Sequence, residues 1–126
     1  MKVMRDGRPV TVEVTADGAG VVSHAGSALL AQVADRLGLT KALSLLLGIK
    51  QRRRGHDPGR VLRDLAVMLA HGGECVSDLG AQRDREALFG SVASDSTAFR
   101  MVDRVASEPG QLDAVRAAHA RARERF

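Results

Sequence analysis

The chain has 126 residues, a single cysteine and a formal net charge of +4. A chain of this length forms one domain with room for a buried core, and one cysteine excludes an internal disulfide framework. No apolar run approaches the roughly 20 residues of a membrane span, and the first seven residues lack the apolar stretch of a signal peptide. We therefore expect a cytoplasmic protein with no membrane partner.

The N-terminal residues have the alternating pattern of a β-strand. Val10, Val12 and Val14 alternate with polar residues over positions 9–14. A turn signal follows at positions 16–18, and positions 20–23 have the composition of a short returning strand. The sequence predicts a β-hairpin leader over residues 1–26.

From Ser27 onward the apolar residues recur at helical spacing, and we expect Ser27 to cap the first helix. Gly38 ends that helix, and its predicted inward stripe is Leu29, Leu30, Val33, Ala34 and Leu37. Further helices are predicted at about 40–47, 58–71, 77–82, 85–89, 94–106 and 110 to the C-terminus. The fold class is mainly α: about seven mostly short helices in an irregular bundle, forming one helical domain over residues 27–126.

A basic loop precedes the strongest predicted helix. Asp57 and Pro58 have the residue types of an N-cap and a first helical position. The basic residues cannot all be buried, and an Arg fork suits phosphate oxygens, so we expect this region to bind the DNA backbone. The predicted phosphate-binding residues are Arg52, Arg53, Arg54, Arg60 and Arg63. Arg bias in a GC-rich genome explains the choice of Arg over Lys equally well, but not the clustering.

The second candidate DNA contact is the start of the helix at 94–106, which Ser94 or Asp95 caps. Its first turns carry Ser94, Ser96, Thr97 and Arg100, residue types that a helix-turn-helix recognition helix presents to phosphate or base edges. A plain capped helix, packed through Phe99 and Val102, explains the same residues.

The sequence predicts no catalytic or metal site. Its acids are scattered, and most lie at helix starts or among arginines, as expected for caps. Gly72 and Gly73 break the predicted helix between His71 and Cys75, and the two residues lack the four-ligand spacing of a zinc site. A Ser–His pair at positions 23, 24 and 27 lacks a third, orienting group, and a turn before a capped helix explains it better.

Several segments, taken in order, resemble the N-terminal region of bacterial DDE-class insertion-sequence transposases, in the group common in actinobacteria. They are VVSHAG at 21–26, RRRGHDPGRVL at 52–62, DLAVMLA at 64–70, ALFG at 87–90 and VASDSTAFR at 92–100. The order and spacing of these segments carry the resemblance, which covers most of the chain from about Asp17.

The resemblance implies an activity, namely cutting and rejoining DNA at transposon ends. It also implies a divalent metal such as Mg²⁺, held by three carboxylates that would follow the last helix and be absent here. The chain is then an inactive N-terminal segment that binds transposon ends and helps the transposase to assemble, with the catalytic domain and a second copy as possible partners.

An alternative is an interaction module that docks on the catalytic domain, or self-associates, without touching DNA. The last predicted helix continues to Phe126 without a stop signal, as expected of a truncated chain. A frayed terminal helix is the alternative explanation.

Overall fold

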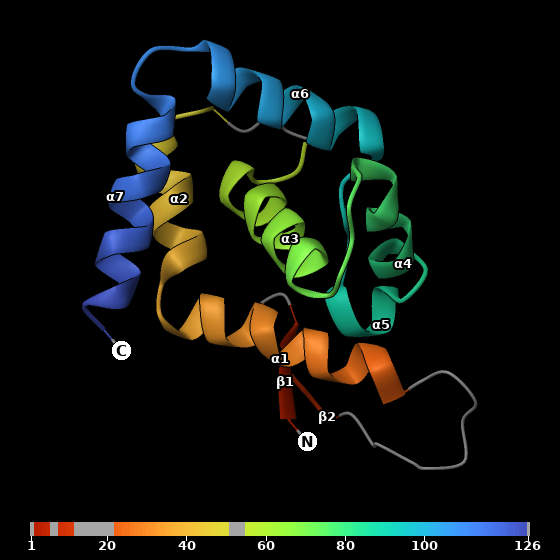
Figure 1. Ribbon diagram of the computed structural model, residues 1–126. Coiled ribbons are helices and arrows are strands. Elements are labelled where there is room, and N and C mark those ends of the chain that lie inside the picture. The colour runs from red at the N-terminus through yellow and green to blue at the C-terminus, as the bar shows by residue number, and fades with distance from the viewer. Residues whose placement is uncertain (1, 6–7, 12–21, 51–54, 126) are drawn as a thin grey trace.

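Helix α3 lies at the centre of the fold, with the other helices arranged around it (Figure 1). The computed structural model describes residues 2–5, 8–11, 22–50 and 55–125. Its elements are β1 (Lys2–Arg5), β2 (Arg8–Thr11), α1 (Val22–Arg36), α2 (Leu39–Leu47), α3 (Pro58–Ala70), the 3₁₀ helix η1 (Val76–Leu79), α4 (Gly80–Arg83), α5 (Glu86–Phe89), α6 (Asp95–Ser107) and α7 (Gln111–Arg123). The described part of the chain is mainly α, as predicted, with seven α-helices.

The N-terminal hairpin predicted from residues 9–14 and 20–23 is not supported. Strands β1 and β2 pair antiparallel instead, with Val3 opposite Val10 and Met4 opposite Pro9. Val22 and Ser23 belong to α1, so the predicted returning strand ends in a helix. Residues 12–21 lie outside the described residues.

Helix α3 begins as predicted. The Asp57 side chain accepts a hydrogen bond from the backbone N–H of Arg60, and Pro58 occupies the first helical position. Because its buried residues recur at helical spacing, α3 can pack on several neighbours at once. Figure 1 shows α1 below it, α2 and α7 on one side, α6 above, and α4 and α5 on the other side.

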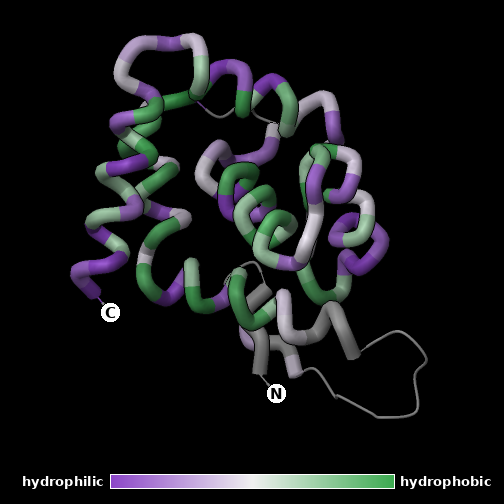
Figure 2. The backbone as a smooth tube through the Cα atoms, in the orientation of Figure 1, coloured by the Kyte–Doolittle hydropathy of each residue, from purple (hydrophilic) through white to green (hydrophobic). Residues whose placement is uncertain are grey.

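Two hydrophobic clusters hold these helices together. The α3 cluster joins α1, α3, η1, α5 and α6 and includes Val61 and Leu79, which are almost completely buried. The α2–α7 cluster contains the buried residues Leu43, Leu47 and Ala118. Leu62 packs against both clusters. Figure 2 shows the hydrophobic stretches of α2 and α3 inside the fold, and a hydrophilic end of α7.

The predicted inward stripe of α1 is wrong for three of its residues, whereas Ala34 and Leu37 are half-buried. Leu29, Leu30 and Val33 are 45–46% exposed, whereas Ala28 and Ala31 are buried. The helix is therefore rotated from the predicted orientation, and its small side chains face α3. Small residues at a contact allow two helices to approach closely, which favours this orientation over the one that buries the leucines.

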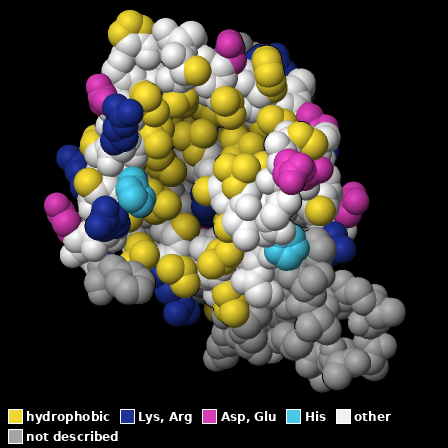
Figure 3. Space-filling view, viewed as in Figure 1, with side chains coloured by type: hydrophobic (Ala, Val, Ile, Leu, Met, Phe, Trp, Pro, Cys, Tyr) yellow, Lys and Arg dark blue, Asp and Glu magenta, His cyan; other side chains and the backbone are white. Residues whose placement is uncertain are grey.

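Helix α6 departs from the prediction in the same way. Ala98 is fully buried, whereas Phe99 is 63% exposed and Val102 is 44% exposed. Both helices thus turn alanine inward and leave larger apolar residues at the surface. Figure 3 shows hydrophobic side chains lining a hollow on the face of Figure 1, over α3 and between α7 and α4.

Gly38 ends α1 as predicted, with a positive φ of 74° that favours glycine. The predicted caps of α1 and α2 differ from those observed. Helix α1 begins at Val22, not at Ser27, and Gly38 is the N-cap of α2. Thr40, the first residue of the range predicted for this helix, donates its hydroxyl to Asp35 at 2.5 Å. None of the described helices is both long and apolar enough to cross a bilayer.

Candidate nucleic-acid interface

The basic loop is anchored to α3 through Asp57. One carboxylate oxygen of Asp57 accepts hydrogen bonds from the Arg60 backbone N–H at 2.9 Å and from the Ser44 hydroxyl at 2.6 Å. The cap therefore joins the start of α3 to α2, and it fixes where the loop ends. Arg52, Arg53 and Arg54 lie outside the described residues, so their part in DNA binding stays a prediction.

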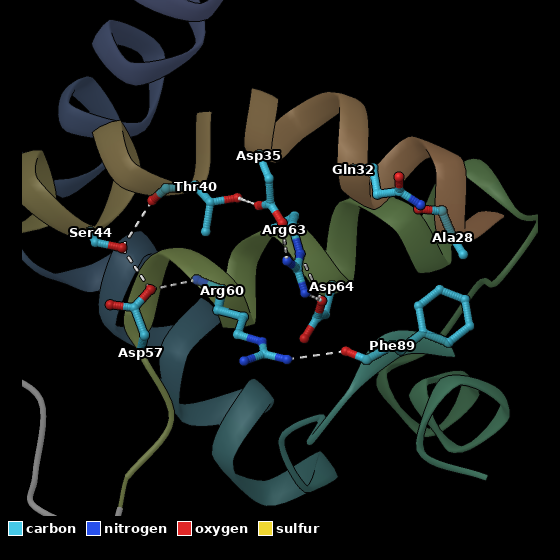
Figure 4. A network of polar contacts seen from close by, with 10 residues as sticks. All are labelled: Ala28, Gln32, Asp35, Thr40, Ser44, Asp57, Arg60, Arg63, Asp64 and Phe89. Carbon is cyan, nitrogen blue, oxygen red and sulfur yellow. Dashed lines mark hydrogen bonds and ion pairs between the residues drawn. The ribbon is translucent and has the colours of Figure 1, made fainter. Parts of the chain in front are cut away.

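The Arg60 side chain points toward Phe89 at the end of α5 (Figure 4). This side chain is half-buried, and Nη2 donates to the carbonyl oxygen of Phe89 at 3.1 Å. Gly90 permits this contact, because a Cβ at that position would overlap Nη2 of Arg60. Arg60 therefore ties α3 to α5, whatever else it contacts.

Arg63 does not face solvent, contrary to the prediction that it continues the charge of the loop. It is 6% exposed and forms ion pairs with Asp35 at 2.8 Å and with Asp64 at 2.6 Å (Figure 4). Two carboxylates already neutralise its guanidinium. Arg63 is therefore not available to phosphate.

Burial and ion pairing shift the pKa values of Arg63 and Asp64 in opposite directions. Burial alone would lower the pKa of Arg63, but the charges and hydrogen bonds of Asp64 and Asp35 outweigh burial and raise that pKa. Burial raises the pKa of Asp64, although the Arg63 guanidinium opposes the shift. The group therefore acts as a structural cross-link between α1 and α3.

The first turn of α6 presents the polar residues that the sequence predicts there. The Ser94 side chain accepts from the Thr97 backbone N–H, which confirms Ser94 as the cap. Ser94, Ser96 and Arg100 are exposed, and Thr97 is half-buried. Arg100 folds back along the helix, donating from Nε to the Ser96 carbonyl at 2.9 Å. No described carboxylate forms an ion pair with Arg100.

Sequence reasoning missed the Arg83 side chain, which positions the first turn of α6. Nη1 of Arg83 donates to the carboxylate of Asp95 at 2.7 Å and to the backbone carbonyl of Ala93 at 3.0 Å. Asp95 was expected to act as a cap, but its carboxylate instead forms an ion pair with the Arg83 side chain of α4. Nothing in the local sequence distinguishes the two roles.

The expected helix-turn-helix-like portion is incomplete. Before α6, both α4 and α5 are only four residues long. A helix-turn-helix needs a full first helix that crosses the DNA backbone. Neither α4 nor α5 therefore supplies such a partner helix for α6.

Comparison with known families decides the class of protein. The family described as transposase DDE domain group 1 matches residues 4–126. The chain belongs to this family. Comparisons with curated proteins and with solved structures returned no match. For this transposase chain, membership implies DNA transposition, with DNA as the partner.

Transposases of the DDE family typically use a divalent metal. Over the described residues of this chain, no group of three or more His, Cys, Asp and Glu side chains could hold a metal ion. These residues therefore do not fit the family's metal, and we assign no catalytic step to them.

Proposed function

We propose that this chain is the N-terminal DNA-binding and assembly segment of a bacterial insertion-sequence transposase. The observation that carries the proposal is the exposed start of α6, with Ser94, Ser96 and, one turn further, Arg100 at the surface of a transposase-family chain. Hydroxyls and an unneutralised guanidinium at a helix start suit phosphate oxygens.

The proposed contact set is smaller than the one predicted from sequence. It keeps Arg52, Arg53, Arg54 and Arg100 as phosphate ligands, with Ser94, Ser96 and Thr97 beside them. Arg60 serves mainly to hold α3 against α5, and Arg63 leaves the set because two carboxylates neutralise it. The divalent metal and the catalytic carboxylates belong to a catalytic domain outside this chain.

The test is the salt dependence of affinity for transposon-end DNA. Four phosphate contacts predict that log affinity falls with log salt with a slope of about −3 to −4. The triple change Arg52→Ala, Arg53→Ala and Arg54→Ala should make the slope shallower by about 3, and Arg100→Ala by about 1.

A charge-matched control separates a site from general basicity. Arg116, Arg121 and Arg123 are exposed on α7, and their triple change to Ala removes the same charge. The control should leave the slope close to that of the wild type. A wild-type slope near zero, or equal slopes for the two triple variants, would reject the proposal.

A second candidate function is docking on another protein surface, either the catalytic domain or a second copy. It is favoured by the exposed apolar residues, namely Leu29, Leu30 and Val33 on α1, Phe99 and Val102 on α6, and Leu112 on α7. Large apolar side chains exposed within about one helical turn, as Leu29, Leu30 and Val33 are on α1, are a feature of interaction sites. A chain that sediments as a monomer at high concentration and does not bind the separately produced catalytic domain would reject this function.

A further inference from the structure

Helix α3 keeps one face open, although it lies at the centre of the fold. Leu62 is half-buried, and Ala66 and Leu69 are exposed, Leu69 to 60%. These residues recur at i, i+4 and i+7, so they lie on one face of the helix. The other sides of α3 contact α1, α2, η1 and α6. The open face therefore forms the floor of the hollow that Figure 3 shows over α3, where hydrophobic side chains gather.

Helix α7 forms a basic rim on one side of this hollow. Arg116, His119 and Arg123 are exposed and follow one another at spacings of three and four residues, so they share one edge of α7. Figure 3 shows a His with Lys or Arg side chains along α7 beside the hollow, and His119 is the only His of that helix. Arg116 pairs with Asp113 on its own helix. No carboxylate among the described residues forms an ion pair with Arg123.

The opposite rim carries an acid. The loop of residues 71–75 leaves the end of α3 and runs beside it on the α4 side (Figure 1). The Asp78 carboxylate fixes this loop, because it accepts hydrogen bonds from the backbone N–H groups of Glu74 at 2.8 Å and Cys75 at 3.0 Å. Glu74 is exposed, and Figure 3 shows acidic side chains on this side of the hollow. Charges of opposite sign therefore lie on the two sides of one apolar floor.

The chemistry of the floor restricts what can cover it. Leucine and alanine side chains offer no hydrogen bond, and a helix such as α3 uses its backbone groups internally. A strand or loop laid on this floor would bury unpaired backbone N–H and C=O groups, whereas a helix pairs its own. A helix also presents apolar side chains at the same spacing of i, i+4 and i+7. The floor therefore favours a helix over an extended segment.

We propose that the hollow binds an amphipathic helix of a partner protein, with its apolar stripe on α3 and an acidic edge along α7. Arg116 and Arg123 are seven residues apart, or about 10 Å along α7, so two carboxylates one heptad apart would match them. Glu74 repels a second acidic edge, so the other edge of the bound helix is neutral or basic. The inference rests on the docking function proposed above and names its partner, and it does not depend on DNA binding.

The probes are two synthetic helices of about 18 residues, long enough to be helical in water, with the same stripe of Leu and Ala. One carries Glu along one polar edge, the other carries Lys there, and all remaining polar positions are Gln. Fluorescence anisotropy should show that the Glu helix binds about threefold to tenfold tighter than the Lys helix, with a smaller difference at high salt. Equal affinities at low salt, or tighter binding of the Lys helix, would overturn the proposal.

Leu69→Glu places a carboxylate in the floor of the hollow and should weaken binding of the Glu helix at least about tenfold. Leu45→Glu is the matched control. Leu45 is 67% exposed and lies on the side of α2 opposite the buried Leu43 and Leu47, so its substitution should leave binding unchanged. Equal losses in the two variants would show that the helix does not use the hollow.

A charge reversal on α7 tests the basic rim. Arg123→Glu should weaken binding of the Glu helix and strengthen binding of the Lys helix. Arg121 is also exposed on α7 but lies on another edge, so Arg121→Glu should change either affinity by less than about twofold. In the wild type, methyl NMR shifts on binding should include Leu62 and Leu69. Shifts confined to other residues would overturn the proposal even if a variant fails to fold.

The remaining outcomes separate this inference from the functions proposed above. Leu69→Glu should leave the salt dependence of DNA affinity unchanged, so a failure of DNA binding does not remove the helix site. Binding of the catalytic domain that Leu69→Glu does not weaken would keep the docking function and overturn the hollow as its site. A wild type that dimerises through the hollow, binds neither helix and becomes monomeric on Leu69→Glu would assign the hollow to a second copy and overturn the inference.

Discussion

Nη1 of Arg63 lies 2.8 Å from Oδ2 of Asp35 and joins the middle of α3 to the end of α1. The second ion pair of Arg63, with Asp64, is almost fully buried. An arginine in the most basic part of the chain therefore serves the fold. This pairing removes Arg63 from the arginines proposed to bind DNA.

Arg63→Ala should lower the free energy of unfolding by about 3–5 kcal/mol, because it leaves Asp64 buried without its partner. Urea denaturation measures the loss. Arg100→Ala, on the exposed side of α6, should change stability by less than about 0.5 kcal/mol. A near-neutral Arg63→Ala would mean that the network contributes nothing to folding.

Gly59→Ala should destabilise the protein by about 1–3 kcal/mol. A Cβ at Gly59 would overlap the Thr40 carbonyl and the Ser44 backbone, so α2 and α3 would have to separate. Gly26 lies inside α1 with open space around it, and Gly26→Ala should stabilise by about 0.5–1 kcal/mol. Thermal melts compare the two. Similar shifts in the same direction would contradict the predicted close approach.

Asp57→Ala should cost about 1–2 kcal/mol, because it removes both the cap of α3 and the bond to Ser44. Asp57→Asn keeps an acceptor oxygen and should recover most of the loss. Urea midpoints of the three proteins test this ranking. A large loss for both variants would show that charge, rather than the cap, is what the site requires.

Asp78 should make stability depend on pH in the acid range. Backbone N–H groups of Glu74 and Cys75 donate to its carboxylate and lower its pKa below the ordinary value. A lowered folded-state pKa contributes stability that is complete above the unfolded pKa of about 4 and is lost as pH falls through the folded value.

The measurement is the urea midpoint of wild type and Asp78→Asn between about pH 6 and pH 2. The wild type should lose more stability than the variant as the pH falls below about 4. Other carboxylates are common to both proteins, so their effects cancel in the difference. Parallel curves would show that these bonds do not favour the charged form.

Local chemistry was readable from the sequence. The cap at Asp57, the cap at Ser94 and the stop at Gly38 all depend on a few neighbouring residues, and all three appear in the structure. Helix positions after residue 39 also agree closely with the predicted ranges. These signals span only one or two turns and do not depend on the packing, although the cap predicted in the same way at Ser27 was wrong.

Ion pairs between residues far apart in the chain could not be predicted from the sequence. Asp35 is 28 residues from Arg63, so the sequence pattern placed Arg63 on an outer face with Arg60. The adjacent Asp64 was the one local hint of neutralisation. The rotation of α1 and α6 was missed because hydrophobicity favours burying Leu29 or Phe99, whereas the close approach of helices favours Ala28 and Ala98.

Alanine packing in α1 and α6 also affects how the purified chain behaves in solution. The larger apolar residues beside these alanines stay in contact with water. Exposed apolar surface of this kind lowers colloidal stability as the protein is concentrated or warmed. Replacing Phe99 and Leu30 with Ser should therefore raise the concentration at which turbidity appears, with little change in melting temperature. Light scattering during slow heating would show the two effects separately.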